Sequence, residues 1–287
     1  MQKFVIPASL RPYMRAPLIG AAFAGLMVLS PIAAGGHIFL LLFSIGGLIV
    51  VVGGVVTVAF MSYETAEVHK ALDAIRRLFR EPRVVPSNSS LQADVTAIMY
   101  CAKLVKEKGM RDLETMINKI GIRDPFIKYG LEMVVSDYSA EDVRSMLETA
   151  AETCFERDNK PVEILSAMAS HAPAFGMVGT LVGMVAMLCS LSDDVSGVGP
   201  SLAVAFLSTL YGVLSARMAF MPAASNIKQE VMQRRSRNYL ITEGMVMLVS
   251  RRGPMYVQDR LNSFMHPHSY EGMNSGLTLP PRKLEAA

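Results

Sequence analysis

The sequence is short of charge and has no tryptophan. Lys, Arg, Asp and Glu make up 18% of its 287 residues, against roughly 25% in soluble globular domains. Hydrophobic residues make up 51%, and the mean hydropathy is +0.33. This balance predicts an integral membrane protein that also has a sizeable polar part.

The signatures of most enzymes and cofactor sites are absent too. The three cysteines, Cys101, Cys154 and Cys189, have neither metal-site nor disulfide-framework spacing, so we expect reduced thiols. The sequence has no glycine-rich nucleotide loop and no convincing pair of a nucleophile with a base. We therefore expect no enzyme, no cofactor and no bound metal. The net charge of +3 is too small to indicate a nucleic-acid partner.

The sequence has long uncharged runs instead. Residues 16–63 contain no charged residue, and a Ser-Pro and a Gly-Gly pair between positions 30 and 36 divide them in two. Because a membrane helix needs about 20 apolar residues, we predict helices near 16–34 and 38–61. A third helix is predicted from Pro161, a favoured first-turn residue, to about Ser192. A fourth is predicted from Ser201 to about Met221, after a polar turn.

The residues between the two hairpins are polar, and their pattern is helical. Glu64 to Phe79 is expected to continue the second membrane helix, and Ser139 to cap a helix with an acidic first turn. We predict an all-α membrane protein with four transmembrane helices in two hairpins and a large cytoplasmic helical domain between helices two and three. The predicted segments are a cytoplasmic leader (1–15), a first membrane hairpin (16–63), a cytoplasmic helical domain (64–160), a second membrane hairpin (161–224), a C-terminal helical region (225–265) and a disordered tail (266–287).

The basic residues predict the orientation. Of the 28 Lys and Arg residues, none lies in the turns at 35–37 and 192–200. They lie in the leader, in the long loop and after Pro222, apart from Arg217 near the end of the fourth helix. Because basic loops stay on the cytoplasmic side, we predict a multi-pass protein with both termini in the cytoplasm.

The predicted membrane segments lack a carboxylate. Between Ile164 and Met221 the only acidic residues are Asp193 and Asp194, in the outward turn. The polar groups that remain are hydroxyls, among them Thr180 and Thr209, which can line a wet path or bind a cation but cannot release a proton near neutral pH. They could equally bond their own helix backbones. If the chain conducts ions, the titrating carboxylate must come from another chain.

Two other features of the third membrane segment bear on its packing. Gly176, Gly179 and Gly183 share one helix face, which lets another helix approach closely. The uncharged segment from Ile164 to Ser192 contains one histidine, His171. We interpret it as an interfacial anchor rather than a proton relay.

The two hairpin motifs resemble a known family. PAFGMVGTLVGMVAML (173–188), a short acidic turn ending in Gly-Pro, and AVAFLSTLYGVLSARMAFMPAA (203–224) are similar to the flagellar motor stator subunits of the MotA/PomA type. The order of helices matches over roughly residues 16 to 250. The loop segment KEKGMRDLE (106–114) resembles that family's charged motif, with a basic residue eight positions before a glutamate.

The resemblance implies a mechanism and partners. It implies an ion-conducting stator subunit in the bacterial inner membrane, in which five copies surround two copies of a MotB/PomB-type partner that supplies a membrane aspartate. By the same resemblance the second hairpin faces the partner, Thr180 and Thr209 line the ion path, and Pro173 and Pro222 couple ion binding to motion. Lys106 and Glu114 would then contact a rotor protein of the FliG type. Lys106 keeps the charge of the family's more usual arginine, but its ammonium group cannot make the two parallel hydrogen bonds that a guanidinium makes to a carboxylate.

The coupling ion and two other classes of protein stay open. The resemblance favours sodium, because sodium-driven members have a threonine at the position of Thr180, but a proton could pass along water held there. The related ExbB/TolQ-type energising channels have three membrane helices, which the uncharged length of 16–63 argues against. A non-conducting membrane scaffold would show the same packing glycines and need no partner carboxylate.

Overall fold

The computed structural model describes residues 44–80, 88–120, 124–191 and 198–264, which contain helices and no β-strand. The predicted leader, first membrane helix and tail lie outside the described residues. The chain divides into two compact units. We call residues 1–83 with 159–229 the apolar unit, and residues 84–158 with 230–287 the polar unit.

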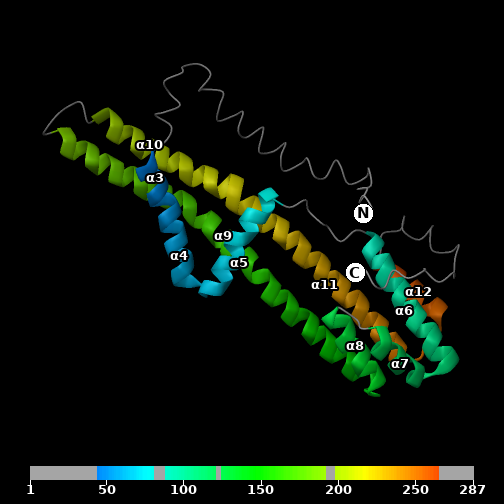
Figure 1. Cartoon of the computed structure of the whole chain (residues 1–287). Helices are drawn as coiled ribbons and strands as arrows, with labels where there is room; N and C mark the ends of the chain where they lie inside the picture. Colours follow the sequence, from blue (N-terminus) through cyan, green and yellow to red (C-terminus); the bar gives the residue numbers. More distant parts are fainter. Residues whose placement is uncertain (1–43, 81–87, 121–123, 192–197, 265–287) are drawn as a thin grey trace, which may run out of the picture. The chain divides into compact units, whose positions relative to one another are not determined.

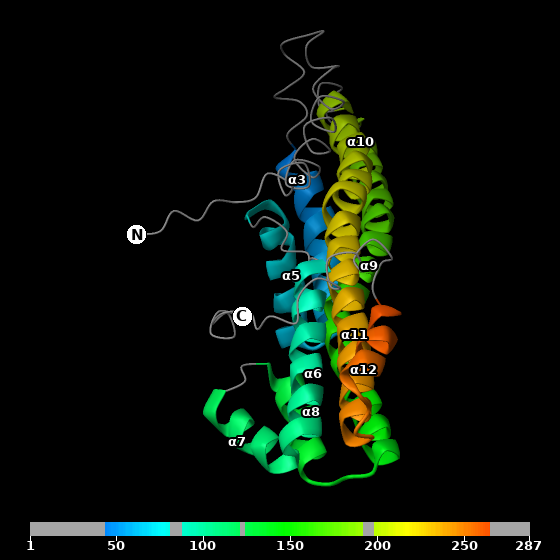
Figure 2. The same ribbon diagram turned by 90° about the vertical axis from the view of Figure 1, so that its right-hand side faces the viewer.

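Most of the apolar unit is built from long helices. Ser44 caps a run formed by α3 (Ile45–Leu48), the π-helical η2 (Ile49–Gly53) and α4 (Gly54–Ser62). After it come α5 (Thr65–Arg80), the C-terminal part of α9 (Ala140–Leu191), α10 (Val198–Leu214), the π-helical η4 (Ser215–Phe220) and the start of α11 (Met221–Val249). Figures 1 and 2 show α10 running beside α9. The runs Ile45–Ser62, Ala140–Leu191 and Val198–Val249 are, among the described residues, the three long and apolar enough to cross a membrane.

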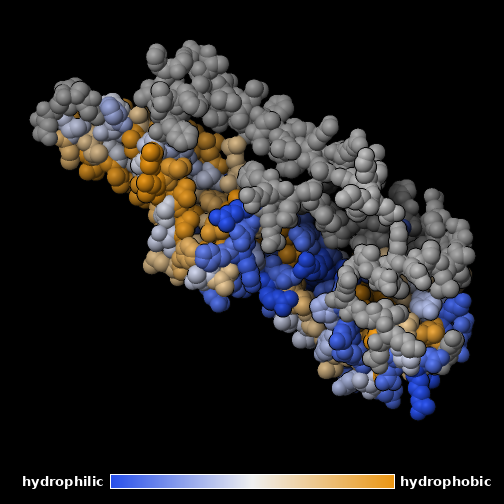
Figure 3. Space-filling model, in the orientation of Figure 1, coloured by the Kyte–Doolittle hydropathy of each residue, from blue (hydrophilic) through white to orange (hydrophobic). Residues whose placement is uncertain are grey.

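The surface of these helices is apolar. Side chains such as Ile45, Leu181 and Phe206 are 59% to 70% exposed, and in Figure 3 hydrophobic residues gather over α3, α9 and α10. Since water would disfavour so large an apolar surface, a lipid environment explains it. The fold class of an all-α membrane protein is confirmed. The count of four membrane helices stays a prediction, because residues 16–34 lie outside the described part.

The prediction that the third membrane helix begins at Pro161 was wrong. Helix α9 runs without a break from Ala140 to Leu191 and contains both Pro161 and Pro173. A proline inside a helix costs about 3 kcal/mol or more. Fully buried side chains on both sides of Pro161, Leu147 before it and Leu165 after it, hold the helix in place.

Two further helix ends differ from prediction. Helix α4 stops at Ser62 because Tyr63 is extended (φ −133°, ψ 160°), and Glu64 then starts α5 by accepting hydrogen bonds from the amides of Glu67 and Val68. Residues Val68 and Ala71 on the apolar face of α5 are fully buried in the apolar unit, which explains the change of direction. The helix of the fourth membrane segment does not break near Met221, because α11 continues it through Pro222 to Val249, into the predicted C-terminal helical region.

The polar unit has a core of buried apolar side chains contributed by several helices. It contains α6 (Asn88–Lys108), α7 (Met110–Ile120), α8 (Pro125–Val135), the N-terminal part of α9, the C-terminal part of α11, and α12 (Pro254–Asn262). The cap predicted at Ser139 is confirmed, since its hydroxyl accepts a hydrogen bond from the amide of Asp142 (3.1 Å). Helix α8 was not predicted. Asp124 caps it by accepting from the amide of Phe126 (2.9 Å), and Pro125 fills its first turn.

Ion pairs between helices, which we call charged clasps, join the helices of the polar unit. Arg237 of α11 donates to Asp94 of α6 (2.6 and 3.0 Å) and to Asp124 at the start of α8 (2.5 Å). Burial opposes ionisation of Asp124, but hydrogen bonds from Arg237 and nearby amides, with the Arg237 charge, hold the pKa of this carboxyl below its usual value. Glu243 is bonded to Arg144 (2.8 Å) and Arg260 (3.0 Å), which likewise lower its pKa against the effect of burial.

Candidate ion path between α9 and α10

Glycines bring α9 and α10 into backbone contact, as predicted from their spacing. A Cβ at Gly183 would lie 2.8 Å from the Cα of Ala205, and one at Gly176 would lie 3.1 Å from the Cα of Thr209. A Cβ at Gly179 would lie 2.5 Å from the Cβ of Ser208. Real Cβ atoms do not approach as closely as at Gly179 and Gly183, and the contact at Gly176 is tighter than most, so glycine at these positions keeps the helices at this spacing. The two helices therefore meet with little side-chain material between them.

Thr180 and Thr209 meet across this contact. Their hydroxyls form a short hydrogen bond with each other. The Thr180 hydroxyl also lies 3.1 Å from the carbonyl oxygens of Gly176 in its own helix and of Ala205 in α10, and Thr209 lies 3.4 Å from the Gly176 carbonyl. Four oxygens from two helices thus gather at one place between apolar surfaces.

This cluster can hold water or a cation, but it cannot titrate. A hydroxyl has one proton to donate and two lone pairs, so these groups can offer oxygen ligands to a hard cation such as sodium. None of them ionises near neutral pH. No group of three or more His, Cys, Asp or Glu residues that could hold a metal occurs in the described residues.

The neighbouring serines behave differently. Ser208 bonds the carbonyl of Val204 (2.8 Å), and Ser215 bonds that of Gly212 (3.1 Å), so both hydroxyls are satisfied within their own helix. This is the arrangement that needs no functional explanation. Cross-helix bonding sets Thr180 and Thr209 apart from Ser208 and Ser215. The Tyr211 hydroxyl of α10 also bonds outside its own helix, because it accepts a hydrogen bond from the amide of Ser44 (3.0 Å).

The two predicted coupling prolines lie in the apolar unit at irregular points of its helices. Pro173 lies inside α9, seven residues before Thr180, or about 10 Å along the helix axis. Pro222 is the second residue of α11 and follows the π-helical η4 directly. There the amide of Met221 bonds the carbonyl of Ala216, five residues back, in the wide turn that precedes a residue with no amide proton. The sequence predicted neither π-helical segment, although Pro222 was a local signal for η4.

Lys106 and Glu114 belong to the polar unit and not to this site. Both are exposed. Gly109, with φ +89°, separates α6 from α7, so Lys106 lies in the last turn of one helix and Glu114 lies in the next. No ion pair between the two occurs in the described residues, which leaves both charges available to a partner.

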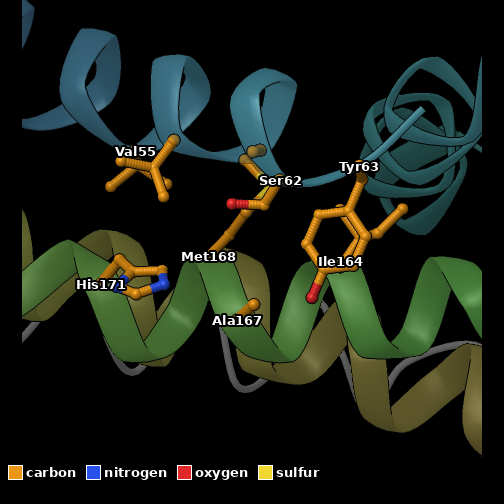
Figure 4. Close-up of a pocket in the computed structure, with 9 residues that line it drawn as sticks. Val55, Ser62, Tyr63, Ile164, Ala167, Met168 and His171 are labelled. Carbon is orange, nitrogen blue, oxygen red and sulfur yellow. The ribbon is translucent and has the colours of Figure 1, made fainter. Parts of the chain in front are cut away.

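His171 lies beside a cavity that is separate from the threonine pair. It lies nine residues before Thr180, which is about half a turn around the helix. Figure 4 shows it beside a cavity between α9 and α4 that is also lined by Ser62, Tyr63 and Met168. His171 is exposed and makes no contact with the threonine pair, in agreement with its interpretation as an anchor.

Comparison with known proteins identifies the family of this chain. Residues 118–238 match the MotA/TolQ/ExbB proton channel family, which is not a family of enzymes. Motility protein A of Borreliella burgdorferi is 30% identical over 66% of this chain and 72% of its own length. Chemotaxis protein PomA of Vibrio alginolyticus is 28% identical over 88% of this chain and 95% of its own. The flagellar MotAB stator complex from Bacillus subtilis superposes with a TM-score of 0.75 over 90% of this chain and 98% of that chain, at 22% identity.

Long apolar helices with an uncharged oxygen cluster between them fit an ion-channel type of membrane protein. The relatives are more specific than this class. The chain belongs to the MotA/TolQ/ExbB proton channel family, and within it to the flagellar stator subunits of the motility protein A and PomA type.

Proposed function

We propose that this chain lines the sodium path of a flagellar motor stator, together with a MotB/PomB-type partner that supplies the missing carboxylate. The observation that carries this proposal is the Thr180–Thr209 oxygen cluster, which lies between two long apolar helices. Solved relatives are complexes of MotA with MotB, which supports a partner of that type. We further propose a ring of five such chains around two partner chains, in the inner membrane, with both termini cytoplasmic.

Sodium is the ion we propose because the site consists of neutral oxygens. A partly dehydrated sodium ion can replace its lost water by the hydroxyl and carbonyl oxygens of both helices. The test is swimming of a strain that lacks its own copy of this gene and carries this chain with its partner. Thr180→Ala and Thr209→Ala should each change the dependence of swimming speed on sodium, whereas Ser215→Ala, which removes a hydroxyl bonded only within its own helix, should not. Sodium-independent swimming of the unmutated chain would leave the proton as the coupling ion.

Pro173 and Pro222 are proposed to couple ion binding to rotation. Pro173→Ala should leave the assembled complex intact and reduce torque, because it restores a hydrogen bond at a point where the helix can bend. Pro161→Ala is the matched control, since Pro161 lies in the same helix at the border of the apolar unit. Torque from bead rotation that is normal in Pro173→Ala, or reduced equally in both variants, would remove this role.

Lys106 and Glu114 are proposed to contact an FliG-type rotor protein. Reversing either charge should weaken rotor engagement and leave ion conduction unchanged, because both lie outside the apolar unit. Lys128→Glu, on the exposed side of α8, is the control for a general effect of charge. Normal swimming of the reversed variants would return both residues to the role of solvated charges.

The partner itself can be tested by mass. The complex purified in detergent with its genomic neighbour should contain five copies of this chain and two single-span partner chains with a membrane aspartate. A stable, functional complex without any membrane carboxylate would favour the non-conducting scaffold.

A further inference from the structure

Helix α12 carries an apolar surface that the fold does not use. Val257 and Leu261 are fully buried and anchor the helix in the core of the polar unit. Met255 and Tyr256 point outward and are 76% and 53% exposed. Met255 is the most exposed large hydrophobic side chain in the described part of the polar unit.

Positive charge surrounds these two side chains. The ammonium group of Lys106 lies 3.8 Å from the place that a Cβ of Gly253 would take, at the start of α12. Arg251 and Arg252 directly precede Gly253 and are exposed, and the Arg252 guanidinium lies 5.3 Å from the centre of the Tyr256 ring. We call Lys106, Arg251, Arg252, Met255 and Tyr256 the α12 surface.

The acidic groups near the α12 surface do not neutralise it. Asp259, one turn after Met255, is exposed on the same helix. Glu107, next to Lys106, already faces Lys103 at 3.9 Å. Three cationic side chains with one free carboxylate beside them leave a net positive surface with an apolar centre.

Arg251 has a backbone conformation that favours glycine. Its φ is +51°, and it ends α11 by donating from its amide to the carbonyl of Leu248, while Arg252 donates to Met247. This helix ending is usually completed by glycine, because a side chain is disfavoured at positive φ. The Arg251 side chain makes no ion pair within the described residues, so an arginine at this strained position is not explained by the fold.

We propose that the α12 surface docks an acidic, partly apolar helix of the rotor protein and extends the contact made by Lys106. This inference rests on the proposed function, which places Lys106 against the rotor. Arg, Met and Tyr are enriched in protein interfaces, and an exposed apolar residue ringed by positive charge fits a helix with acidic residues around an apolar one. The chain's own end is a poorer match, because residues 265–287 contain as many basic as acidic residues, Arg282 and Lys283 against Glu271 and Glu285.

Site-specific photo-crosslinking in swimming cells tests the occupant. The full chain would carry the photo-reactive amino acid benzoylphenylalanine at position 255, with position 129 as control because Tyr129 is an exposed side chain of α8, 40% exposed. We expect a crosslink to the rotor protein from position 255 and none from position 129. Crosslinks from position 255 to the chain's own tail, to a second copy, to lipid or to nothing would each overturn the proposal.

A substitution separates docking from folding. Arg251→Gly relieves the strained backbone, so the melting temperature of the purified complex should stay the same or rise. The same change removes one cation, and Met255→Ser removes the apolar centre. Each should lower the affinity of the complex for the purified rotor protein about three- to tenfold, the usual range for a moderate interface residue. Unchanged affinity in both variants would overturn the docking role.

The two proposals fail in different ways. If the unmutated chain restores swimming but position 255 does not crosslink to the rotor, only the docking proposal is wrong. If the unmutated chain does not restore swimming with its partner, the proposed function is wrong, and the docking proposal falls with it.

Discussion

The two units of this chain solve the same packing problem in opposite ways. In the apolar unit, helices α9 and α10 meet through their backbones, with Gly183 against Ala205 and Gly176 against Thr209. In the polar unit, helices meet through large buried side chains such as Leu147, Leu240 and Met245, and through the Arg237 and Glu243 clasps. The apolar unit also leaves many large hydrophobic side chains exposed.

The solvent explains the difference. In water, each Å² of apolar surface that is buried stabilises the fold by about 25 cal/mol, so large side chains belong in the interior. In lipid that gain is absent, and association depends on close van der Waals packing and on hydrogen bonds between helices. The proposed ion path is a product of this second mode, because backbone contact brings Thr180 and Thr209 within hydrogen-bonding distance.

The largest effect is expected from removing a core side chain in the polar unit. Leu147→Ala should lower the free energy of unfolding by about 2–5 kcal/mol, since Leu147 is fully buried and leaves a cavity. Burial raises the pKa of the neighbouring core thiol Cys101 to about 11, so this thiol reacts only when the core opens. In a chain with Cys154→Ser and Cys189→Ser, labelling of Cys101 should be much faster in Leu147→Ala than in Met146→Ala, which alters a side chain that is 39% exposed. Equal labelling would contradict a side-chain-packed core.

In the apolar unit, adding a side chain at a glycine is the strongest test of close backbone packing. Gly183→Val adds atoms where a Cβ would meet the backbone of Ala205 at 2.8 and 2.9 Å, and overpacking of this kind costs about 1–3 kcal/mol. We expect α9 and α10 to separate, and both swimming and the melting temperature of the purified complex to fall. Gly46→Ala is the matched control, because nothing lies within 4 Å of a Cβ there. If both variants behave alike, close backbone approach is not what holds these helices.

Sequence reasoning did best where one physical constraint dominates. The apolar part of the second membrane helix was predicted to reach about residue 61, since bilayer thickness limits an apolar run, and α4 ends at Ser62. The predicted continuation of the same helix into Glu64–Phe79 was wrong, because Tyr63 is extended. Sequence reasoning also failed at Pro161, where buried neighbours outweigh a local helix breaker, and it did not predict α8, which begins at Pro125 after the Asp124 cap. The Thr180 and Thr209 hydroxyls were visible in the sequence. Their mutual contact was not, because it depends on which residue of α10 faces each glycine of α9.

Acid should weaken the polar unit through its clasps. The pKa of Asp124 is lower in the folded chain than its ordinary value, so its ionised form stabilises the fold above that ordinary value, about 3.9. This stability is lost as the pH falls through the lower, folded-state pKa. Asp124→Asn should remove about 1 kcal/mol or more at neutral pH. The folded fraction of this variant, followed by circular dichroism, should depend less on pH below about 4 than that of the unmutated chain.

The control for this acid effect lies in the same unit. Glu132→Gln, in an exposed pair on α8, should leave the pH dependence of the folded fraction unchanged, since such pairs contribute little. An acid sensitivity that is the same in Asp124→Asn as in the unmutated chain would show that the Arg237 clasp does not couple ionisation to folding.

The smallest effect is expected from removing one threonine hydroxyl in each unit. Thr242 in the polar unit is 1% exposed and bonds only the carbonyl of Asn238 in its own helix (2.9 Å), so Thr242→Val should change stability by less than about 0.5 kcal/mol. Thr180→Val has the same shape change but removes bonds to Ala205 and Thr209 across the helix contact, worth about 0.6–1.7 kcal/mol in membrane proteins. It should also alter the sodium dependence of swimming, which Thr242→Val should leave unchanged. A pair of variants with equal stability and equal sodium dependence would mean that the threonine contact neither joins the helices nor binds the ion.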